Sequence, residues 1–197
     1  MLAHYELYKT IVGFPGHVVE CGVYKGASFL RFATVREILE SPYSRKIVGF
    51  DAFGRFSEGM ADTNDRDCIS RFSAEGGDGI SHNSFIEVLS HKGFGNFELM
   101  EGDICSTVPQ CVVDHPELKI ALLHIDVDIY QPSRVILDQL FDRVVRHGLV
   151  VFDDYGTVAG ETLAVDEFLQ QTHKELLVEK LPISHIPAYI RKGLCSI

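Results

Sequence analysis

The sequence contains no apolar run of membrane-spanning length, no block of basic residues and no cysteine pair spaced as C-x-x-C. A transmembrane helix needs about 18 or more consecutive apolar residues, so the first absence argues against a membrane protein. Nucleic acids and anionic lipids require concentrated positive charge, whereas this chain has 18 basic and 28 acidic side chains and a net charge of −10. We therefore expect no nucleic acid and no membrane as partner.

The five cysteines are odd in number and form neither a disulfide framework nor a zinc-binding pattern. This usage is typical of a reducing compartment. The first nine residues lack the basic segment and the apolar stretch of a secretory signal. The sequence therefore predicts a cytoplasmic protein.

Several common catalytic and nucleotide-binding motifs are also absent. There is no G-x-x-x-x-G-K-[ST] phosphate loop and no G-x-S-x-G nucleophile elbow. Gly22 and Gly26 are four residues apart, which does not fit the G-x-G-x-x-G fingerprint and disfavours NAD. The histidines show no paired metal-binding spacing, and His124 lies in an apolar run, where a core histidine is expected.

A chain of 197 residues, 46% of them hydrophobic, is long enough to bury a core, and we expect a single domain over residues 1–197. Apolar runs alternate with helix-period segments, which predicts an α/β fold with a doubly wound, largely parallel sheet. The five predicted parallel strands are residues 18–20, 47–51, 97–101, 120–126 and 149–153. The predicted helices are residues 5–12, within an N-terminal helical segment 1–15, and residues 27–39, 84–90, 132–145 and 162–171.

The rest of the chain predicts a sheet edge and a long loop. Residues 176–181 and 188–191 are expected to form an antiparallel hairpin at the edge, and Gly148 is expected to end the preceding helix. Residues 52–82 are rich in Gly, Asp and Ser and too long for a simple connection. Loops of that length are usually lids or binding loops, so an acceptor-binding role is expected.

The segment VECGVYKGAS, residues 19–28, runs from a predicted strand through a glycine-bearing turn into a helix. Glu20 at the strand end would repel a pyrophosphate but suits the ammonium group of a cofactor such as S-adenosylmethionine. Asp51 closes the next strand, where it could accept hydrogen bonds from a ribose. Asp103 is a third acid at the same edge. A tight turn without ligand, and turn-capping roles for both aspartates, are the alternatives.

Two pairs of acids give the strongest signal. HIDVDIY places Asp126 and Asp128 at the end of one predicted strand, and VFDDY places Asp153 and Asp154 at the end of the next. Converging carboxylates repel one another unless a cation lies among them, and oxygen ligands favour Mg²⁺, Mn²⁺ or Ca²⁺. In the alternative interpretation, Asp128 caps the following helix and the other pair faces solvent.

Taken in order, these segments resemble the macrocin O-methyltransferase (TylF-like) family. The matching residues are 19–28, 49–53, 101–103, 124–132, 151–156 and 164–168. The resemblance implies a class I S-adenosylmethionine-dependent methyltransferase fold, with a Rossmann-like sheet of about seven strands and one antiparallel edge strand. It also implies a Mg²⁺- or Mn²⁺-dependent enzyme that methylates a sugar hydroxyl of a natural product or glycan. Relatives often associate, which leaves a homo-oligomer open.

Site residues follow from the resemblance. The metal ligands would be Asp126, Asp153 and Asp154. The cofactor-binding residues would be Glu20, Gly22, Tyr24, Lys25, Gly26 and Ser28, with Asp51 at the ribose and Asp103 near the adenine.

The catalytic base is less defined by the resemblance. Some relatives carry a histidine three residues after the first acid of D-x-D, but this chain has Ile129 there. The base is therefore expected to be Asp126, Asp128 or a residue from elsewhere. A catechol-type O-methyltransferase and a non-catalytic cofactor- or metal-binding module are the alternative functions.

Overall fold

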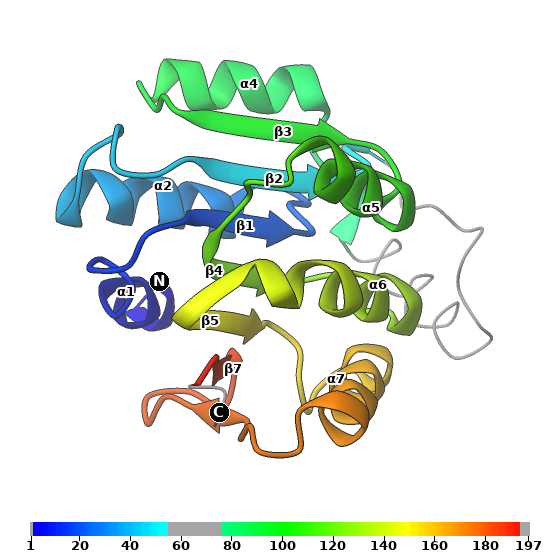
Figure 1. Ribbon diagram of the computed structural model, residues 1–197. Coiled ribbons are helices and arrows are strands. Elements are labelled where there is room, and N and C mark those ends of the chain that lie inside the picture. Colours follow the sequence, from blue (N-terminus) through cyan, green and yellow to red (C-terminus); the bar gives the residue numbers. More distant parts are fainter. Residues whose placement is uncertain (1, 55–75, 194–197) are drawn as a thin grey trace.

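The computed structural model describes residues 2–54 and 76–193. A seven-stranded sheet lies between two layers of helices (Figure 1). The strands are β1 His17–Cys21, β2 Ile47–Asp51, β3 Phe97–Glu101, β4 Ile120–Ile125, β5 Val144–Phe152, β6 Glu179–Lys180 and β7 Ala188–Arg191. The helices are α1 Leu2–Lys9, α2 Ala27–Leu39, α4 His82–His91, α5 Ile104–Asp114, α6 Tyr130–Leu140 and α7 Ala159–Thr172, with a 3₁₀ turn, η2, at Phe141–Arg143.

The strand order is β3-β2-β1-β4-β5-β7-β6. Strands β1 to β5 pair in parallel, whereas β7 is antiparallel to both β5 and β6. The expected seven strands and the antiparallel hairpin at the edge are thus confirmed. Because β1 pairs with both β2 and β4, the sheet order reverses there, and the carboxyl ends of these strands flank the crevice where α/β proteins bind ligands.

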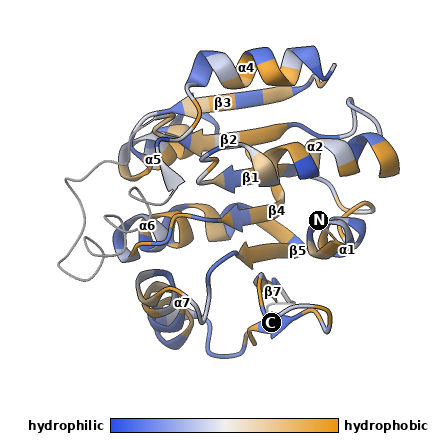
Figure 2. Cartoon of the chain, turned by 180° about the vertical axis from the view of Figure 1, so that it is seen from behind, coloured by the Kyte–Doolittle hydropathy of each residue, from blue (hydrophilic) through white to orange (hydrophobic). Residues whose placement is uncertain are grey.

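Each face of the sheet has its own apolar core. Helices α1, α2 and α4 cover one face through residues such as Tyr8, Phe32 and Phe85, and α5, α6 and α7 cover the other. All six residues of β4 are buried, because helices cover this central strand on both sides. Figure 2 shows β4 and β5 as mainly hydrophobic strands, with more hydrophilic residues on the helices around them.

The connection from α6 to β5 differs from the sequence prediction. The helix expected over residues 132–145 ends at Leu140, and β5 begins at Val144, so the prediction was wrong at this end. Gly148 lies inside β5, not at a helix end. A Cβ at Gly148 would lie 2.8 Å from a side-chain carbon of Val144 and 2.9 Å from the carbonyl oxygen of Ala121. Close packing within an irregular part of the strand, and not a helix stop, explains the glycine.

Several other helices and strands have bounds that differ from the predicted ones. Helix α5 was not predicted, because Pro109 lies inside it and proline is disfavoured in helix interiors. Helix α1 begins at Leu2 and ends at Lys9, earlier than the predicted 5–12, and α7 begins at Ala159. Only two residues of the strand expected at 176–181 pair, as β6. Of the long loop 52–82, residues 55–75 lie outside the described residues.

Among the helices of the described ranges, none combines the length and the apolar composition that crossing a bilayer requires.

The substitution Gly148→Ala tests the packing of β5. The added methyl group would contact Val144 and the backbone of β4, so we expect the free energy of unfolding to fall by about 1–3 kcal/mol. Gly13→Ala is the matched control, because its Cβ would have no neighbour within 4 Å, and it should change stability by less than about 0.5 kcal/mol. Equal stability of the two variants in urea unfolding would contradict this account of Gly148.

Candidate active site at the carboxyl edge of the sheet

The acids at the ends of β4 and β5 are brought together by strand pairing. Ile125 pairs with Phe152, so Asp126 and Asp153 leave the sheet side by side. The amide of Asp153 donates to the carbonyl of Ile125 at 3.0 Å, and the amide of Asp126 donates to the carbonyl of Cys21 at 2.9 Å. The backbone of both acids is therefore held at the edge, next to the end of β1.

Asp126, Asp153 and Asp154 each offer one carboxylate oxygen, and these oxygens lie within 4.8 Å of one another. Burial raises the pKa of Asp126 well above its usual value. The charge of His124 lowers this pKa, whereas the charges of the neighbouring carboxylates raise it further. For Asp153, the ion pair with His124 outweighs burial and lowers the pKa. An all-oxygen donor set in which the ligands repel one another fits a hard divalent cation such as Mg²⁺ or Mn²⁺.

Asp128 lies beside these three acids in a strained backbone conformation. Its φ angle is +64°, in the left-handed region that non-glycine residues seldom adopt. Burial raises the pKa of Asp128 to about 7, and a hydrogen bond to the Asp154 carboxylate and its charge add to the effect. Strain of this kind often occurs at functional sites.

Glu20 and His124 lie behind the acids and are fully buried. They pair in register between β1 and β4. His124 Nδ1 is 3.3 Å from Glu20 Oε1, and His124 Nε2 is 3.5 Å from Asp153 Oδ1. Burial raises the pKa of Glu20, whereas for His124 the two carboxylates outweigh burial and raise the pKa well above its usual value. His124 is a core residue, as expected, but it lies between two acids.

His4 and Glu161 were not identified from the sequence. His4 reaches in from α1, with its ring centroid 5.4 Å from that of His124 and its Nε2 4.0 Å from Asp153 Oδ1. Burial lowers the pKa of His4 to about 3, so its ring is neutral. Helix α1 has only eight residues, and no hydrophobic periodicity in its sequence indicates that His4 faces the site.

Glu161 connects the two acid-bearing loops. Its buried carboxylate accepts a hydrogen bond from the amide of Asp154 at 3.0 Å, and its own amide donates to the carbonyl of Asp128 at 3.2 Å. The sequence shows Glu161 only as an acid near a helix start, which is a common and uninformative position.

The glycine-bearing turn after β1 requires both of its glycines. Gly22 has a φ of +92°, and a Cβ there would lie 1.7 Å from the carbonyl oxygen of Asp126. Gly26 has a φ of +79°, and its Cβ would lie 2.2 Å from the ring of Phe85. The turn therefore packs directly against the acid-bearing segment on one side and α4 on the other.

The other predicted cofactor residues surround this turn. The Asp51 carboxylate accepts hydrogen bonds from the amides of Val23 and Tyr24, at 2.7 and 2.9 Å, and from Phe53 at 2.6 Å. Asp51 thus shapes the turn, and its contact with a ribose stays a prediction. The side chains of Tyr24 and Lys25 both donate to the carbonyl of Gly76, at 2.6 and 2.7 Å.

Two predicted residues have local roles in the structure. Asp103 caps α5 by accepting from the amide of Cys105 at 3.0 Å, as in the capping alternative. Ser28 donates its hydroxyl hydrogen to Glu20, whose carboxylate has no exposed surface. Contacts of Asp103 and Glu20 with a cofactor stay predictions.

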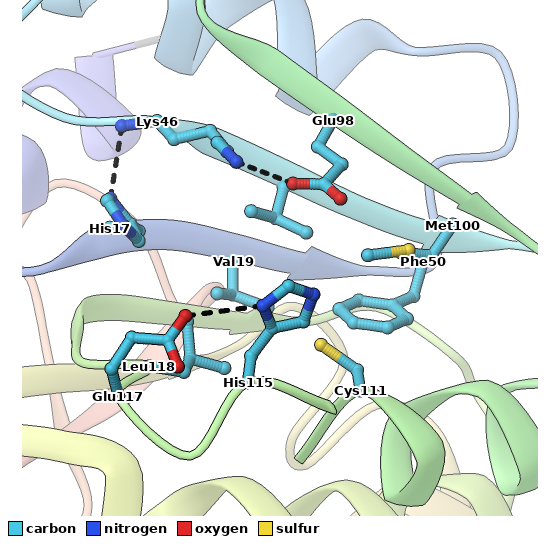
Figure 3. A pocket seen from close by; sticks show the side chains of 11 residues that line it. His17, Val19, Lys46, Phe50, Glu98, Met100, Cys111, His115, Glu117 and Leu118 are labelled. Atoms are coloured by element: carbon cyan, nitrogen blue, oxygen red, sulfur yellow. Dashed lines mark hydrogen bonds and ion pairs between the residues drawn. The ribbon is translucent and has the colours of Figure 1, made fainter. Parts of the chain in front are cut away.

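A cavity of about 80 Å³ lies between one face of β1, β2 and β3 and the carboxyl end of α5 (Figure 3). Its apolar floor includes Val19 and Phe50, and ion pairs form between Lys46 and Glu98 at 2.6 Å and between His115 and Glu117 at 3.3 Å. None of the predicted site residues lines this cavity, so the candidate site is the acidic carboxyl edge.

The strand order, the glycine-bearing turn after β1 and the acidic edge define a class I S-adenosylmethionine-dependent methyltransferase fold. More particularly, the chain belongs to the macrocin-O-methyltransferase (TylF) family, whose model matches residues 8–192.

Known proteins agree with this assignment. The chain is 26% identical over 153 residues to 8-demethyl-8-(2,3-dimethoxy-alpha-L-rhamnosyl)-tetracenomycin-C 4'-O-methyltransferase of Streptomyces olivaceus, a match that covers 73% of this chain and 54% of that relative. The chain thus spans about half of that relative's length. The calicheamicin methyltransferase CalS11 aligns with a TM-score of 0.81 and 29% identity over 98% of this chain and 78% of CalS11. The O-methyltransferase NovP has the same fold, with a TM-score of 0.84 and 19% identity over 97% of this chain and 78% of NovP.

The raised pKa of Asp128 predicts a pH-dependent stability without metal. The folded protein keeps the proton on Asp128 up to about pH 7, whereas the unfolded chain releases it near pH 4. The free energy of unfolding should therefore fall as pH rises from about 4 to about 7, by at most about 4 kcal/mol from this group. Asp128→Asn should flatten this fall in urea unfolding with chelator present. An unchanged pH profile in the variant would contradict the assignment.

Proposed function

We propose that the protein is an S-adenosylmethionine- and Mg²⁺-dependent O-methyltransferase that acts on a sugar hydroxyl of a natural product or glycan. The observation that carries the proposal is the convergence of Asp126, Asp153 and Asp154 beside the glycine-bearing turn of a TylF-family chain. Two similar proteins support a sugar acceptor, since one is named for a rhamnosyl-tetracenomycin and CalS11 is described as a TDP-rhamnose 3'-O-methyltransferase.

The turn and the acids would have separate roles. The backbone of the turn and the side chains of Tyr24 and Lys25 would hold the cofactor, and the three aspartates would hold the cation. When bound, S-adenosylmethionine supplies an activated methyl group and Mg²⁺ supplies a Lewis acid that lowers the pKa of the acceptor hydroxyl. Placing both groups at one edge of the sheet would align the hydroxyl oxygen with the methyl group.

The proton of the hydroxyl needs an acceptor. Asp126 and Asp128 are the candidates, because each is a partly exposed carboxylate at the edge. A carboxylate held within hydrogen-bond distance of the acceptor hydroxyl can take its proton as a general base. Ile129 has a hydrocarbon side chain that cannot accept a proton, and His124 is enclosed between two carboxylates.

The variant Asp154→Asn tests the metal-dependent step. Loss of one carboxylate ligand should lower turnover at least about 100-fold at 1 mM Mg²⁺, while the affinity for S-adenosylhomocysteine stays within about 3-fold. Turnover is measured as S-adenosylhomocysteine released with TDP-rhamnose, rhamnosyl glycosides and catechols as acceptors. Asp138→Asn is the matched control, since this exposed acid on α6 pairs only with Arg134 in the described structure and should keep wild-type turnover.

Two outcomes would overturn the proposal. A fully active Asp154→Asn enzyme that needs no metal would remove the role of the three aspartates. Methylation of catechols but of no sugar hydroxyl would replace the sugar acceptor with a phenol.

A further inference from the structure

A buried imidazole connects the two halves of the proposed site. On one side His124 Nδ1 lies 3.3 Å from Glu20 Oε1, and on the other His124 Nε2 lies 3.5 Å from Asp153 Oδ1. The same oxygen of Glu20 accepts the hydroxyl of Ser28, the second residue of α2. An unbroken series of polar side chains therefore runs from the helix that follows the cofactor turn to a predicted metal ligand.

The interior holds this imidazole in place. The rings of His4 and Phe32 pack edge-on against His124, with centroid distances of 5.4 and 5.3 Å. His124 and Glu20 have no exposed surface. Neither buried ring nitrogen has a regular hydrogen bond to any described residue, and the two carboxylates at ion-pair distance are the acidic partners that the ring faces. The ring therefore cannot turn toward one carboxylate without losing the other.

We propose that His124 is a positioning residue that couples cofactor binding to metal binding. This inference rests on the proposed function. A cation held by Asp126, Asp153 and Asp154 fixes the direction of the Asp153 carboxylate, and His124 transmits that constraint to Glu20, Ser28 and the start of α2. Because linkage is reciprocal, a cofactor that orders the turn must strengthen metal binding by the same factor.

The coupling is measured with two probes on the full chain, S-adenosylhomocysteine and Mg²⁺, by isothermal titration calorimetry. We expect Mg²⁺ to lower the Kd of S-adenosylhomocysteine by about 5- to 150-fold relative to chelator, the usual range for coupled sites. Saturating S-adenosylhomocysteine should lower the Kd of Mg²⁺ by the same factor. A factor near 1 in the wild type, with both ligands bound, overturns the inference.

Two conservative variants test separately the contact of His124 with Glu20 and its contact with Asp153. The amide of His124→Asn reaches about as far as Nδ1 and keeps a donor toward Glu20. The amide of His124→Gln reaches about as far as Nε2 and keeps a donor toward Asp153. In both variants the coupling factor should fall below about 2. The Asn variant should keep the chelator-measured affinity for S-adenosylhomocysteine within about 3-fold, and the Gln variant should keep the affinity for Mg²⁺ alone.

Ser28→Ala removes the hydrogen bond from Ser28 to Glu20 and leaves His124 unchanged. If the His124 variants do not fold, this variant tests whether the series of side chains couples the two ligands. It should also reduce the coupling factor below about 2. His115→Gln is the control, because His115 forms a similar 3.3 Å pair with Glu117 at the opposite edge, and its coupling factor should equal that of the wild type.

The possible failures can be told apart. Wild-type coupling retained in Ser28→Ala and in the folded His124 variants overturns the inference but leaves the proposed function standing. A wild-type protein that binds neither S-adenosylhomocysteine nor Mg²⁺ overturns the proposed function, and the inference with it.

Discussion

Repulsion among carboxylates is the constraint on which the arrangement of this protein depends. Asp126, Asp128, Asp153 and Asp154 leave two adjacent parallel strands at one edge, and fully buried Glu20 lies behind them. Burial at this edge raises the pKa values of Asp126 and Asp128, and the charges of the neighbouring carboxylates raise them further. Countercharge from His124, and from a cation in the proposed function, offsets this repulsion.

The helices around the edge limit how far these acids can move apart. Helix α7 contributes Glu161, whose carboxylate and amide bond to the loops after β5 and β4. Helix α1 contributes His4 to the rings around His124. Held in this way, the acids keep the close spacing that a divalent cation requires, which is the usual relation between a rigid scaffold and a site built on it.

Much of the fold was predictable, because strands covered on both faces appear in the sequence as short runs of β-branched and aliphatic residues. Strands β2 and β3 have the predicted bounds, whereas α5 was missed because Pro109 masks its helical pattern. The predicted end of α6 was also wrong. Apolar Val144 continues the helical spacing in the sequence, but in the structure it pairs with Ile120 in the sheet. Strand pairing, which involves residues far apart in the chain, overrode the local preference there.

By itself, the sequence determined the alternation of strands and helices, the glycines of the turn and the four acids that follow two strands, since each of these is encoded in neighbouring residues. Only the tertiary structure decided that Glu20, His124 and Asp153 form one series and that His4 and Glu161 belong to the site. Apart from the bond between Glu161 and Asp154, these contacts join residues that are far apart in the chain. They depend on sheet register and helix packing, which no local pattern of residues specifies.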